Sequence, residues 1–444
     1  MTEKKPLFKR QRVAPKSKTR NLKRFKTAAD VNKLVSLHEA QQIVLGQAQP
    51  LPTELIRLEE GGGRVLARGV RASIDEPSTT QAAMDGYAVR SEDVESASPE
   101  RDLFLKVVGQ VGAGQRSEHR LKGGETLRVM TGATLPEGAD SVVPDEMTES
   151  HSGRVRVIAP VAPGDYLLPA GAEIRRGQQL ISKGIVLRAR EMTALATQGY
   201  QTLEAIRQPM VSVLATGSEL KDVGERLHGG EVFASNLHTV SQLVKRCGGV
   251  IRSMGIAGDD LQSLTESIRK GGQADVVVTT GGTGRGEKDL VSAAIATLDG
   301  ELFFHGVAMS PGKQTIFAQL DKTLVFGLPG RPVATYVAFE QLVRPMLLRM
   351  IGLSQVFLPE ITATLTHSIR LKGRTFSFLF SRLTFGPRGP EVKVLRSKRK
   401  GIMAEMLASN GLIKVEPGRE RLQEGEGVRV QLLDLGLDGL SYFD

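Results

Sequence analysis

Three short apolar runs between residues 209 and 352 constrain the fold of this chain more than any other feature. Residues 210–215, 274–280 and 324–328 are rich in valine and apolar on both faces, and segments with helical periodicity separate them. A strand that is apolar on both faces has to be covered on both sides, as in a parallel sheet between two layers of helices. The pattern therefore predicts a central, doubly wound α/β domain.

The regions on either side of this domain have the pattern of β structure. Glycine-rich turns separate short alternating runs between 60 and 160, and from 358 the apolar residues again recur with period two. Ser36 followed by Glu39 forms a capping box that predicts a helix there. The predicted organisation is a basic tail at 1–30, an N-terminal linker and β domain at 31–207, the α/β domain at 208–352 and a small C-terminal β domain at 353–444.

The net charge of +10 lies in the N-terminal tail. Residues 1–26 hold eleven basic residues against the single acid Glu3, so the rest of the chain is close to neutral. Basic residues collected in a tail predict a disordered segment and argue against a DNA-reading face. A solubilising extension is favoured over an anchor for an acidic partner or RNA, and both stay open.

Composition narrows the class of protein further. No apolar run approaches the roughly 20 residues of a membrane span, and the N-terminus has no apolar segment of a secretory signal. A cytoplasmic protein is therefore expected. The single cysteine, Cys247, lies in phase with Val240 and Val244, which predicts a small buried side chain. The seven histidines show no metal-ligand spacing.

Two glycine-rich loops follow strands of the predicted sheet. The first spans 281–289 and the second 327–332, and Lys313 lies in a Pro-Gly-Lys turn between them. Glycine lets backbone N–H groups approach an anion, and the helix that follows adds partial positive charge. Ligands of open parallel sheets bind at the carboxyl ends of the strands. The loops therefore predict a phosphate or oxyanion cleft, with plain strand-to-helix turns as the alternative.

Short motifs spread over residues 36–435 resemble those of one known family. They are Met-Asp-Gly-Tyr-Ala at 84–88, Met-Thr-Gly-Ala at 130–133, Thr-Gly-Ser-Glu-Leu at 216–220, Ser-Asn at 235–236, Asp-Asp at 259–260, Pro-Gly-Lys at 311–313 and Gly-Leu-Pro-Gly at 327–330. In this order and spacing they resemble the molybdopterin molybdenumtransferases, the family that includes the C-terminal domain of gephyrin. The resemblance implies a homodimer that inserts molybdate into adenylylated molybdopterin, releases AMP and uses Mg²⁺.

The resemblance also implies roles for individual residues. Asp85, Lys313 and Asp289 would be catalytic, and the two carboxylates would bind Mg²⁺, which prefers oxygen ligands. The implied substrate contacts are Thr131, Gly132, Glu219, Asn236, Gly281, Gly282, Gly286 and Gly330, and Arg285 and Arg331 are expected to bind the substrate as replacement anion contacts. From the residues alone, Asp289 could equally cap a helix, and Asp85 could belong to an Asp-Gly turn. Ser235 or Asn236 is expected to cap the helix that follows them.

Several polar positions differ from the family pattern. Ser310 replaces a lysine before Pro-Gly-Lys, Arg331 replaces the asparagine of Gly-Asn-Pro, Arg285 enters the first loop, and Lys400 falls near positions where serines are expected. Positive charge is thus redistributed within an anion cleft. Three functions stay open: a working transferase with a shifted site, a paralogue that binds molybdopterin or nucleotide without turnover, and a scaffold for protein contacts.

Overall fold

The computed structural model describes residues 34–284, 289–395 and 402–433. The chain divides into two compact units, one of Pro52–Arg207 and one that combines Met1–Leu51 with Gln208–Asp444. The predicted basic tail at 1–30, as well as Arg285, Gly286 and Lys400, lies outside the described residues. Among the helices of the described part, none is long and apolar enough to cross a membrane.

The Pro52–Arg207 unit contains a six-stranded sheet. Its strands, in the order β7-β4-β6-β5-β9-β8, are Ser141–Pro144, Gly86–Val89, Glu125–Val129, Leu103–Val111, Arg154–Val157 and Thr148–His151. The neighbouring residues Ala88 and Val89 are both fully buried but belong to different hydrophobic clusters. Since successive side chains of a strand point to opposite faces, both faces of this sheet are covered.

A smaller part of the same unit holds its two chain ends together. Strand β1 (Thr53–Arg57) pairs with β12 (Thr202–Ile206), and β2 (Val70–Arg71) pairs with β11 (Gln179–Ile181). Helix α4 (Ala189–Thr197) places Leu195 in the core that these strands form. The unit therefore enters and leaves through one antiparallel strand pair.

The other unit is built on a central six-stranded sheet in the order β16-β13-β17-β21-β20-β18. The strands are Val250–Ala257, Met210–Thr216, Val276–Thr280, Thr323–Leu328, Ile316–Leu320 and Glu301–His305. The first four are parallel, and the three apolar runs predict β13, β17 and β21 among them, whereas β20 is antiparallel to both β21 and β18. Because β18 reverses β20, it runs in the same direction as the parallel strands.

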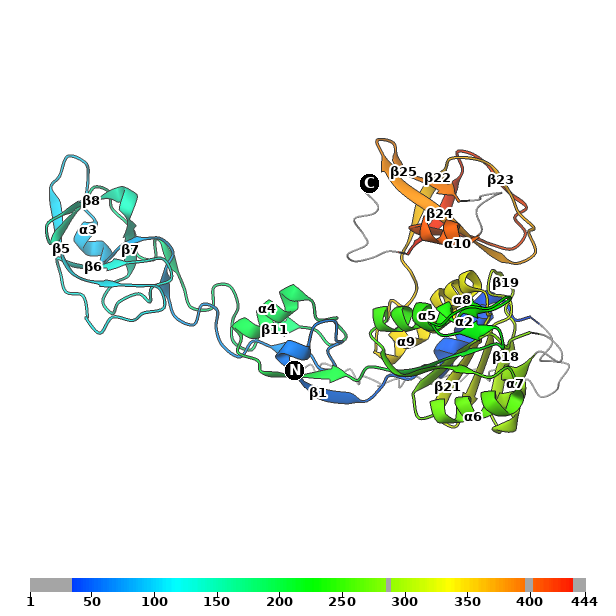
Figure 1. Cartoon of the computed structure of the whole chain (residues 1–444). Helices are drawn as coiled ribbons and strands as arrows, with labels where there is room; N and C mark the ends of the chain where they lie inside the picture. Colours follow the sequence, from blue (N-terminus) through cyan, green and yellow to red (C-terminus); the bar gives the residue numbers. More distant parts are fainter. Residues whose placement is uncertain (1–33, 285–288, 396–401, 434–444) are drawn as a thin grey trace, which may run out of the picture. The chain divides into compact units, whose positions relative to one another are not determined.

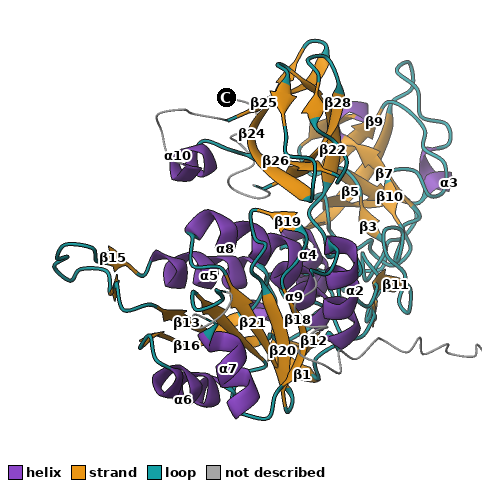
Figure 2. Cartoon of the chain, turned by 90° about the vertical axis from the view of Figure 1, so that its right-hand side faces the viewer, coloured by secondary structure: helices purple, strands orange, loops and turns teal. Residues whose placement is uncertain are grey.

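Helices cover both faces of the central sheet (Figures 1 and 2). One face carries α6 (Leu261–Gly271) and α7 (Leu290–Thr297), and the other carries α5 (Ser235–Arg246), α8 (Pro332–Ala338), α2 (Leu37–Gln47) and α9 (Arg344–Met350). Ser36 caps α2, accepting a 3.1 Å hydrogen bond from the backbone N–H of Glu39. The expected cap of α5 is wrong: the helix begins at Ser235 after Ala234, which has no capping side chain.

A π-helical turn, Phe339–Val343, joins α8 to α9 and carries the buried acid Glu340. Glu340 pairs with Arg246 of α5 and lies 3.5 Å from Nε of Arg344. Nη1 of Arg246 also donates a 3.2 Å hydrogen bond to the carbonyl of Leu433. The cluster therefore connects two helices of the central domain to the end of the C-terminal domain.

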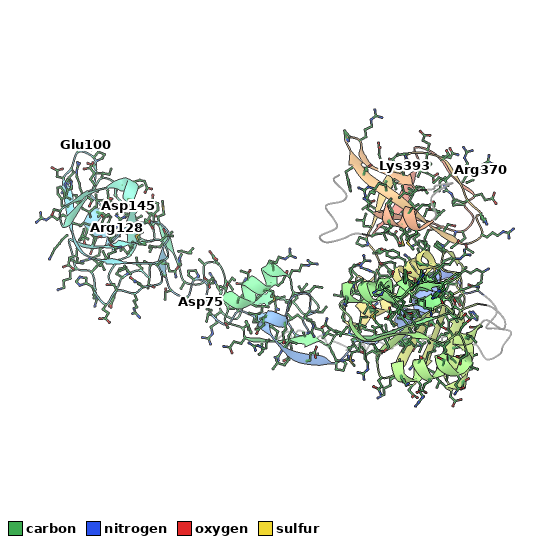
Figure 3. All side chains as sticks on the ribbon, viewed as in Figure 1. Asp75, Glu100, Arg128, Asp145, Arg370 and Lys393 are labelled. Carbon is green, nitrogen blue, oxygen red and sulfur yellow. The ribbon has the colours of Figure 1, made fainter. Side chains whose placement is uncertain are left out.

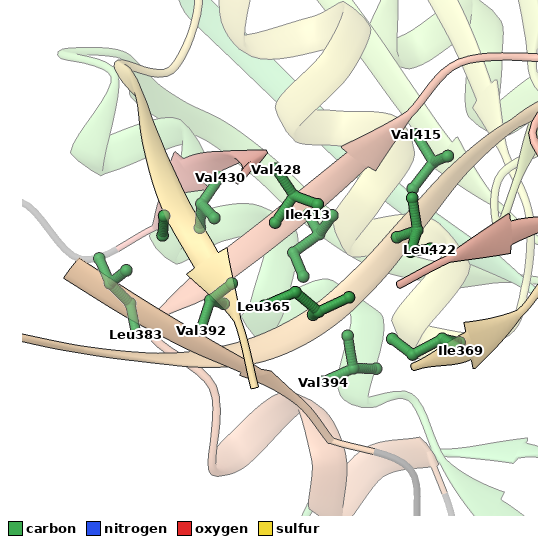
Figure 4. Packing of buried hydrophobic residues seen from close by; sticks show 11 residues of the cluster. Leu365, Ile369, Leu383, Val392, Val394, Ile413, Val415, Leu422, Val428 and Val430 are labelled. Carbon is green, nitrogen blue, oxygen red and sulfur yellow. The ribbon is translucent and has the colours of Figure 1, made fainter. Parts of the chain in front are cut away.

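The C-terminal domain is a small β structure around an aliphatic core (Figure 4). Its sheet has the order β19-β24-β25-β22-β28-β26, formed by Met309–Ser310, Phe376–Gly386, Gly389–Val394, Glu360–Leu365, Gly427–Leu432 and Gly411–Val415. Strand β19 comes from the central domain and pairs in parallel with the start of β24. This pairing fixes the Pro311–Lys313 turn at the junction of the two domains.

Candidate active site

The carboxyl ends of the parallel strands open into a cavity of about 920 Å³. The loops after β13, β16, β17 and β21 contribute to its lining, and so does the start of α5. Parallel strands bring the segments that follow them to one edge of the sheet, where such folds bind ligands. The predicted substrate residues Glu219, Asn236, Gly281, Gly282, Gly330 and Arg331 all line this cavity.

The two glycine-rich loops pack directly against each other at this edge. The backbone N–H of Gly281 donates a 3.0 Å hydrogen bond to the carbonyl of Leu328. Gly281 has a φ of 90°, and a Cβ at this position would meet the Thr216 carbonyl oxygen at 2.3 Å. Only glycine fits such a position without moving the backbone. The absent side chain leaves main-chain groups facing the cavity.

Asn236 ties the start of α5 to the second loop. Its Nδ2 donates a 2.8 Å hydrogen bond to the carbonyl of Gly330, which explains why its side chain does not cap the helix. The other amide atom, Oδ1, is buried and has no partner among the described residues. Buried polar atoms are nearly always satisfied, so an unpaired acceptor in a cavity wall indicates a place for a ligand donor.

A smaller cavity of about 370 Å³ adjoins the first. Lys313 and Arg331 both line it, and Gln314, Gly330 and Arg331 line both cavities. No carboxylate belongs to the described lining of the smaller cavity. One ammonium and one guanidinium therefore give this end of the cleft a positive charge suited to an oxyanion.

Two carboxylates of the described residues, Glu219 and Asp259, line the larger cavity. Gly217 lets Glu219 fold over its loop, since a Cβ there would lie 2.6 Å from Oε2 of Glu219. Asp259 follows β16 and precedes Asp260, whose carboxylate caps α6 with a 2.8 Å bond from the N–H of Ser263. Asp259 is thus left to face the cavity, a role that the sequence reasoning did not assign to it.

The predicted catalytic residue Asp289 is engaged elsewhere. Its Oδ1 accepts a 3.2 Å hydrogen bond from the N–H of Ser292, which caps α7, and its Oδ2 lies 3.2 Å from Nδ1 of His305. Neither Asp289 nor His305 lines the cavity, and both side chains are more than four-fifths buried. Within the described chain, no group of three acidic, histidine or cysteine side chains is arranged to hold a metal ion.

The remaining predicted residues lie in the six-stranded sheet of the other unit. Oδ1 of Asp85 accepts hydrogen bonds from both the backbone N–H and the hydroxyl of Thr131, at 2.7 and 2.8 Å. The backbone bond from Thr131, then its hydroxyl, and more weakly the charge of Arg128 lower the pKa of Asp85. Gly132 follows with a φ of 82°. The structure thus brings Asp85, Thr131 and Gly132 together.

Arg128 holds the neighbouring surface of this sheet in place (Figure 3). Its guanidinium makes two parallel hydrogen bonds of 2.7 and 2.6 Å to the carboxylate of Asp145 and lies 5.0 Å from the ring centre of Tyr87. The backbone N–H of Asp145 in turn donates to the carbonyl of Asp85. The pair of Arg128 and Asp145 therefore holds the backbone of Asp85 in a fixed position.

Known proteins of one family match nearly the whole chain. A molybdopterin molybdenumtransferase of Staphylococcus aureus is 30% identical over 401 residues, which cover 90% of this chain and 96% of that protein. The chain belongs to the molybdopterin molybdenumtransferase family. The enzyme of this name from a Nostoc species is also 30% identical, over 86% of this chain and 89% of its own length.

Three family models and two solved structures agree with this assignment. The models are the MoeA N-terminal region (domain I and II) at 35–199, the probable molybdopterin binding domain at 212–349 and the MoeA C-terminal region (domain IV) at 362–433. Two crystal structures of a molybdopterin biosynthesis MoeA protein from Pyrococcus horikoshii have TM-scores of 0.80 and 0.74 and sequence identities of 32% and 28%. They cover 91% and 90% of this chain and the whole of the solved chains. The chain is therefore a transferase of molybdenum cofactor biosynthesis with the multidomain architecture of its family.

Proposed function

We propose that this transferase inserts molybdate into adenylylated molybdopterin, cleaves the diphosphate bond and releases AMP in a Mg²⁺-dependent reaction. The observation that carries the proposal is the continuity of the two cavities, which share Gln314, Gly330 and Arg331. The larger one has room for a pterin nucleotide, since ligand pockets range over roughly 300–1,000 Å³. The smaller one is lined by two cations and suits molybdate.

Different residues of the cleft bind different charged groups of the substrate. The main chain of the two glycine-rich loops faces the diphosphate, where N–H groups can stabilise anionic oxygens without a competing side chain. Oδ1 of Asn236, which has no partner among the described residues, accepts a hydrogen bond from a donor on the pterin or the nucleotide. Lys313 and Arg331 hold the oxyanion against the dithiolene end.

Two carboxylates of the cleft are candidate ligands for a magnesium ion. Glu219 and Asp259 present oxygen donors to the larger cavity, whereas Asp289 would have to release His305 before it could bind a metal. Bound Mg²⁺ would neutralise charge on the diphosphate oxygens as the bond breaks. We therefore add Glu219 and Asp259 to Asp289 and Asp85 as candidate ligands.

The engaged carboxylate of Asp289 and the serine at 310 favour a second candidate function. A paralogue that binds molybdopterin or its nucleotide without turnover needs the cavities and the backbone groups but no available catalytic carboxylate. Such a protein would act as a carrier.

One assay separates the two functions. The purified full chain is incubated with adenylylated molybdopterin, molybdate and magnesium, and AMP is quantified by chromatography. AMP release that requires both molybdate and magnesium supports the transferase. Tight binding of the nucleotide with no AMP above the protein-free control would replace it with the carrier.

A further inference from the structure

Phe233 presents an aromatic ring to the larger cavity of the cleft. It is the only aromatic side chain among the described residues that line this cavity. The side chain is 40% exposed, and its ring makes no contact with another aromatic ring of the described chain. Val232 and Leu220 also line the cavity, so this part of the wall is apolar, whereas the glycine-rich loops offer main-chain groups.

A pair of two-residue strands positions Phe233. Strand β15 (Val232–Phe233) pairs in parallel with β14 (Leu220–Lys221). The residues on either side of Phe233, Val232 and Ala234, donate backbone hydrogen bonds of 2.8 and 2.9 Å to carbonyls of the opposite segment. The backbone of Phe233 is therefore held from both sides, while its side chain keeps an open face for a ligand.

The strand order places Phe233 and the cations of the cleft on different sides of the first glycine-rich loop. Strand β14 follows β13 in the sequence, and Figure 2 shows β15 on the side of the central sheet where β13 and β16 lie. Arg331 follows β21, and β17 with its glycine-rich loop lies between β13 and β21. A ligand that reaches from Arg331 to Phe233 therefore crosses the loop that follows β17.

We propose that the adenine ring of the substrate stacks on the phenyl ring of Phe233. The inference rests on the function proposed above, in which the diphosphate lies on the glycine-rich loops and the dithiolene end lies at Lys313 and Arg331. The diphosphate joins the adenosine to the molybdopterin, so the adenosine lies across the loops from the cations, on the side of Phe233. Bases stack on aromatic side chains through their flat faces. Phe233 would thus select the adenylylated form of molybdopterin over the form without the nucleotide.

A tryptophan at this position reports stacking directly. The chain contains no tryptophan, so Phe233→Trp gives the full chain a single indole inside the cavity. AMP is expected to quench the indole fluorescence in a saturable titration, whereas ribose 5-phosphate, which lacks the base, is not. Phe357→Trp is the matched control, because Phe357 is similarly exposed at 43% and lines neither cavity, and AMP should leave its fluorescence unchanged.

Calorimetric titration of AMP measures what the ring contributes to affinity. Phe233→Ala should weaken AMP about tenfold, and Phe233→Tyr, which keeps the ring, should change its affinity less than about twofold. The proposal is overturned if Phe233→Ala binds AMP as wild type does, or if ribose 5-phosphate quenches the indole as strongly as AMP. Stronger quenching by a phosphate-free pterin would also overturn it, since the ring would then bind the pterin.

These titrations contain neither molybdate nor magnesium, so their outcome is independent of AMP release. Quenching by AMP in a chain that releases no AMP from adenylylated molybdopterin would keep the stacking contact and replace the transferase with the carrier. AMP release by wild type without quenching in Phe233→Trp would keep the transferase and overturn the stacking contact.

Discussion

Nδ1 of His305 lies 3.2 Å from Oδ2 of Asp289, so the last residue of β18 holds the residue that caps α7. Nε2 of the same imidazole is buried and has no partner among the described residues. Because β18 runs parallel to β21, His305 reaches the edge of the sheet where the glycine-rich loops lie. The pair thus fixes Asp289 beside the cleft while keeping its carboxylate out of it.

Asp289→Asn tests whether this carboxylate acts in the reaction. The amide oxygen can still cap α7, so the fold should keep its stability to within about 1 kcal/mol. We expect loss of magnesium-dependent AMP release, measured by chromatography, if Asp289 leaves His305 to act on the substrate or the ion.

Asp260→Asn is the matched control, because Asp260 is also a helix cap at the same sheet edge. It should retain AMP release. Full activity in Asp289→Asn would show that Asp289 acts only as a helix cap. Glu219 and Asp259 would then be the candidate carboxylates for the reaction.

Thr131→Val should raise the pKa of Asp85 toward its ordinary value. The variant removes the 2.8 Å hydroxyl bond and keeps the stronger backbone bond, so the shift should be partial. A carboxylate with a depressed native pKa stabilises the fold above its unfolded pKa, and this contribution disappears as the pH falls through the native pKa. In wild type it is therefore lost only in acid, below the ordinary value of 3.8.

Carbon-detected NMR titration of the Asp85 side chain measures this directly. Thr148→Val, which removes a threonine hydroxyl bonded to the carbonyl of Asp145, is the control and should leave the titration of Asp85 unchanged. An unaltered midpoint in Thr131→Val would show that the backbone bond alone sets the pKa.

The sequence was sufficient to predict the central domain because its signals are local. Apolar runs at 210–215, 274–280 and 324–328 correspond to β13, β17 and β21, and glycines after them mark the cleft. The sequence pattern did not predict β18 and β20. These strands extend the sheet at its edge through antiparallel pairing, which depends on contacts with other strands and not on a local pattern. Strand β19 was not predicted either, because it forms only by pairing with β24, which lies about 67 residues further along the chain.

The candidate site could be predicted only in part. The residue types of the glycines and of Lys313 are enough to predict an anion cleft. Whether Asp259 or Asp260 faces the cleft depends on which of the two caps helix α6, and the sequence does not determine that. No metal-ligand spacing in the sequence involves His305. Its contact with Asp289 depends on the direction of its strand, which the sequence pattern did not predict. Side-chain orientation therefore decided what motif spacing could not.

Glu340→Gln should destabilise the unit that contains the central and C-terminal domains. It leaves Arg246 and Arg344 without their shared anion, and breaking a buried ion pair costs about 3 kcal/mol. Calorimetry should show a lower unfolding temperature. Glu266→Gln, which removes an exposed pair with Arg269 on α6, should cost no more than about 0.5 kcal/mol. Equal effects of the two changes would contradict a structural role for the π-helical turn.

The family resemblance predicts a homodimer that does not require the tail. Light scattering should give twice the chain mass of 48.0 kDa for the full chain. A variant that lacks residues 1–26 should also scatter as a dimer, because those residues contribute the net charge and few apolar side chains. A monomer in the shortened variant alone would assign dimerisation to the tail.

Arg331→Ala should weaken molybdate binding. Arg331 and Lys313 line the same 370 Å³ cavity, and Ser310 leaves the adjoining turn without a second ammonium group. A guanidinium can bind an oxyanion through two N–H groups, so Arg331 would supply the missing charge. The side chain is exposed, which reduces the contribution, and we expect a loss of about tenfold, or roughly 1.4 kcal/mol.

Calorimetric titration of molybdate into the full chain measures the change. Arg226→Ala is the control, because Arg226 lies in an exposed loop of the same domain and lines neither cavity. Raising the salt concentration should reduce wild-type affinity more steeply than that of Arg331→Ala, since the variant has one cation fewer at the anion. Wild-type affinity and salt dependence in Arg331→Ala would mean that the guanidinium does not face the oxyanion, and Lys313 with the backbone groups would then have to hold it alone.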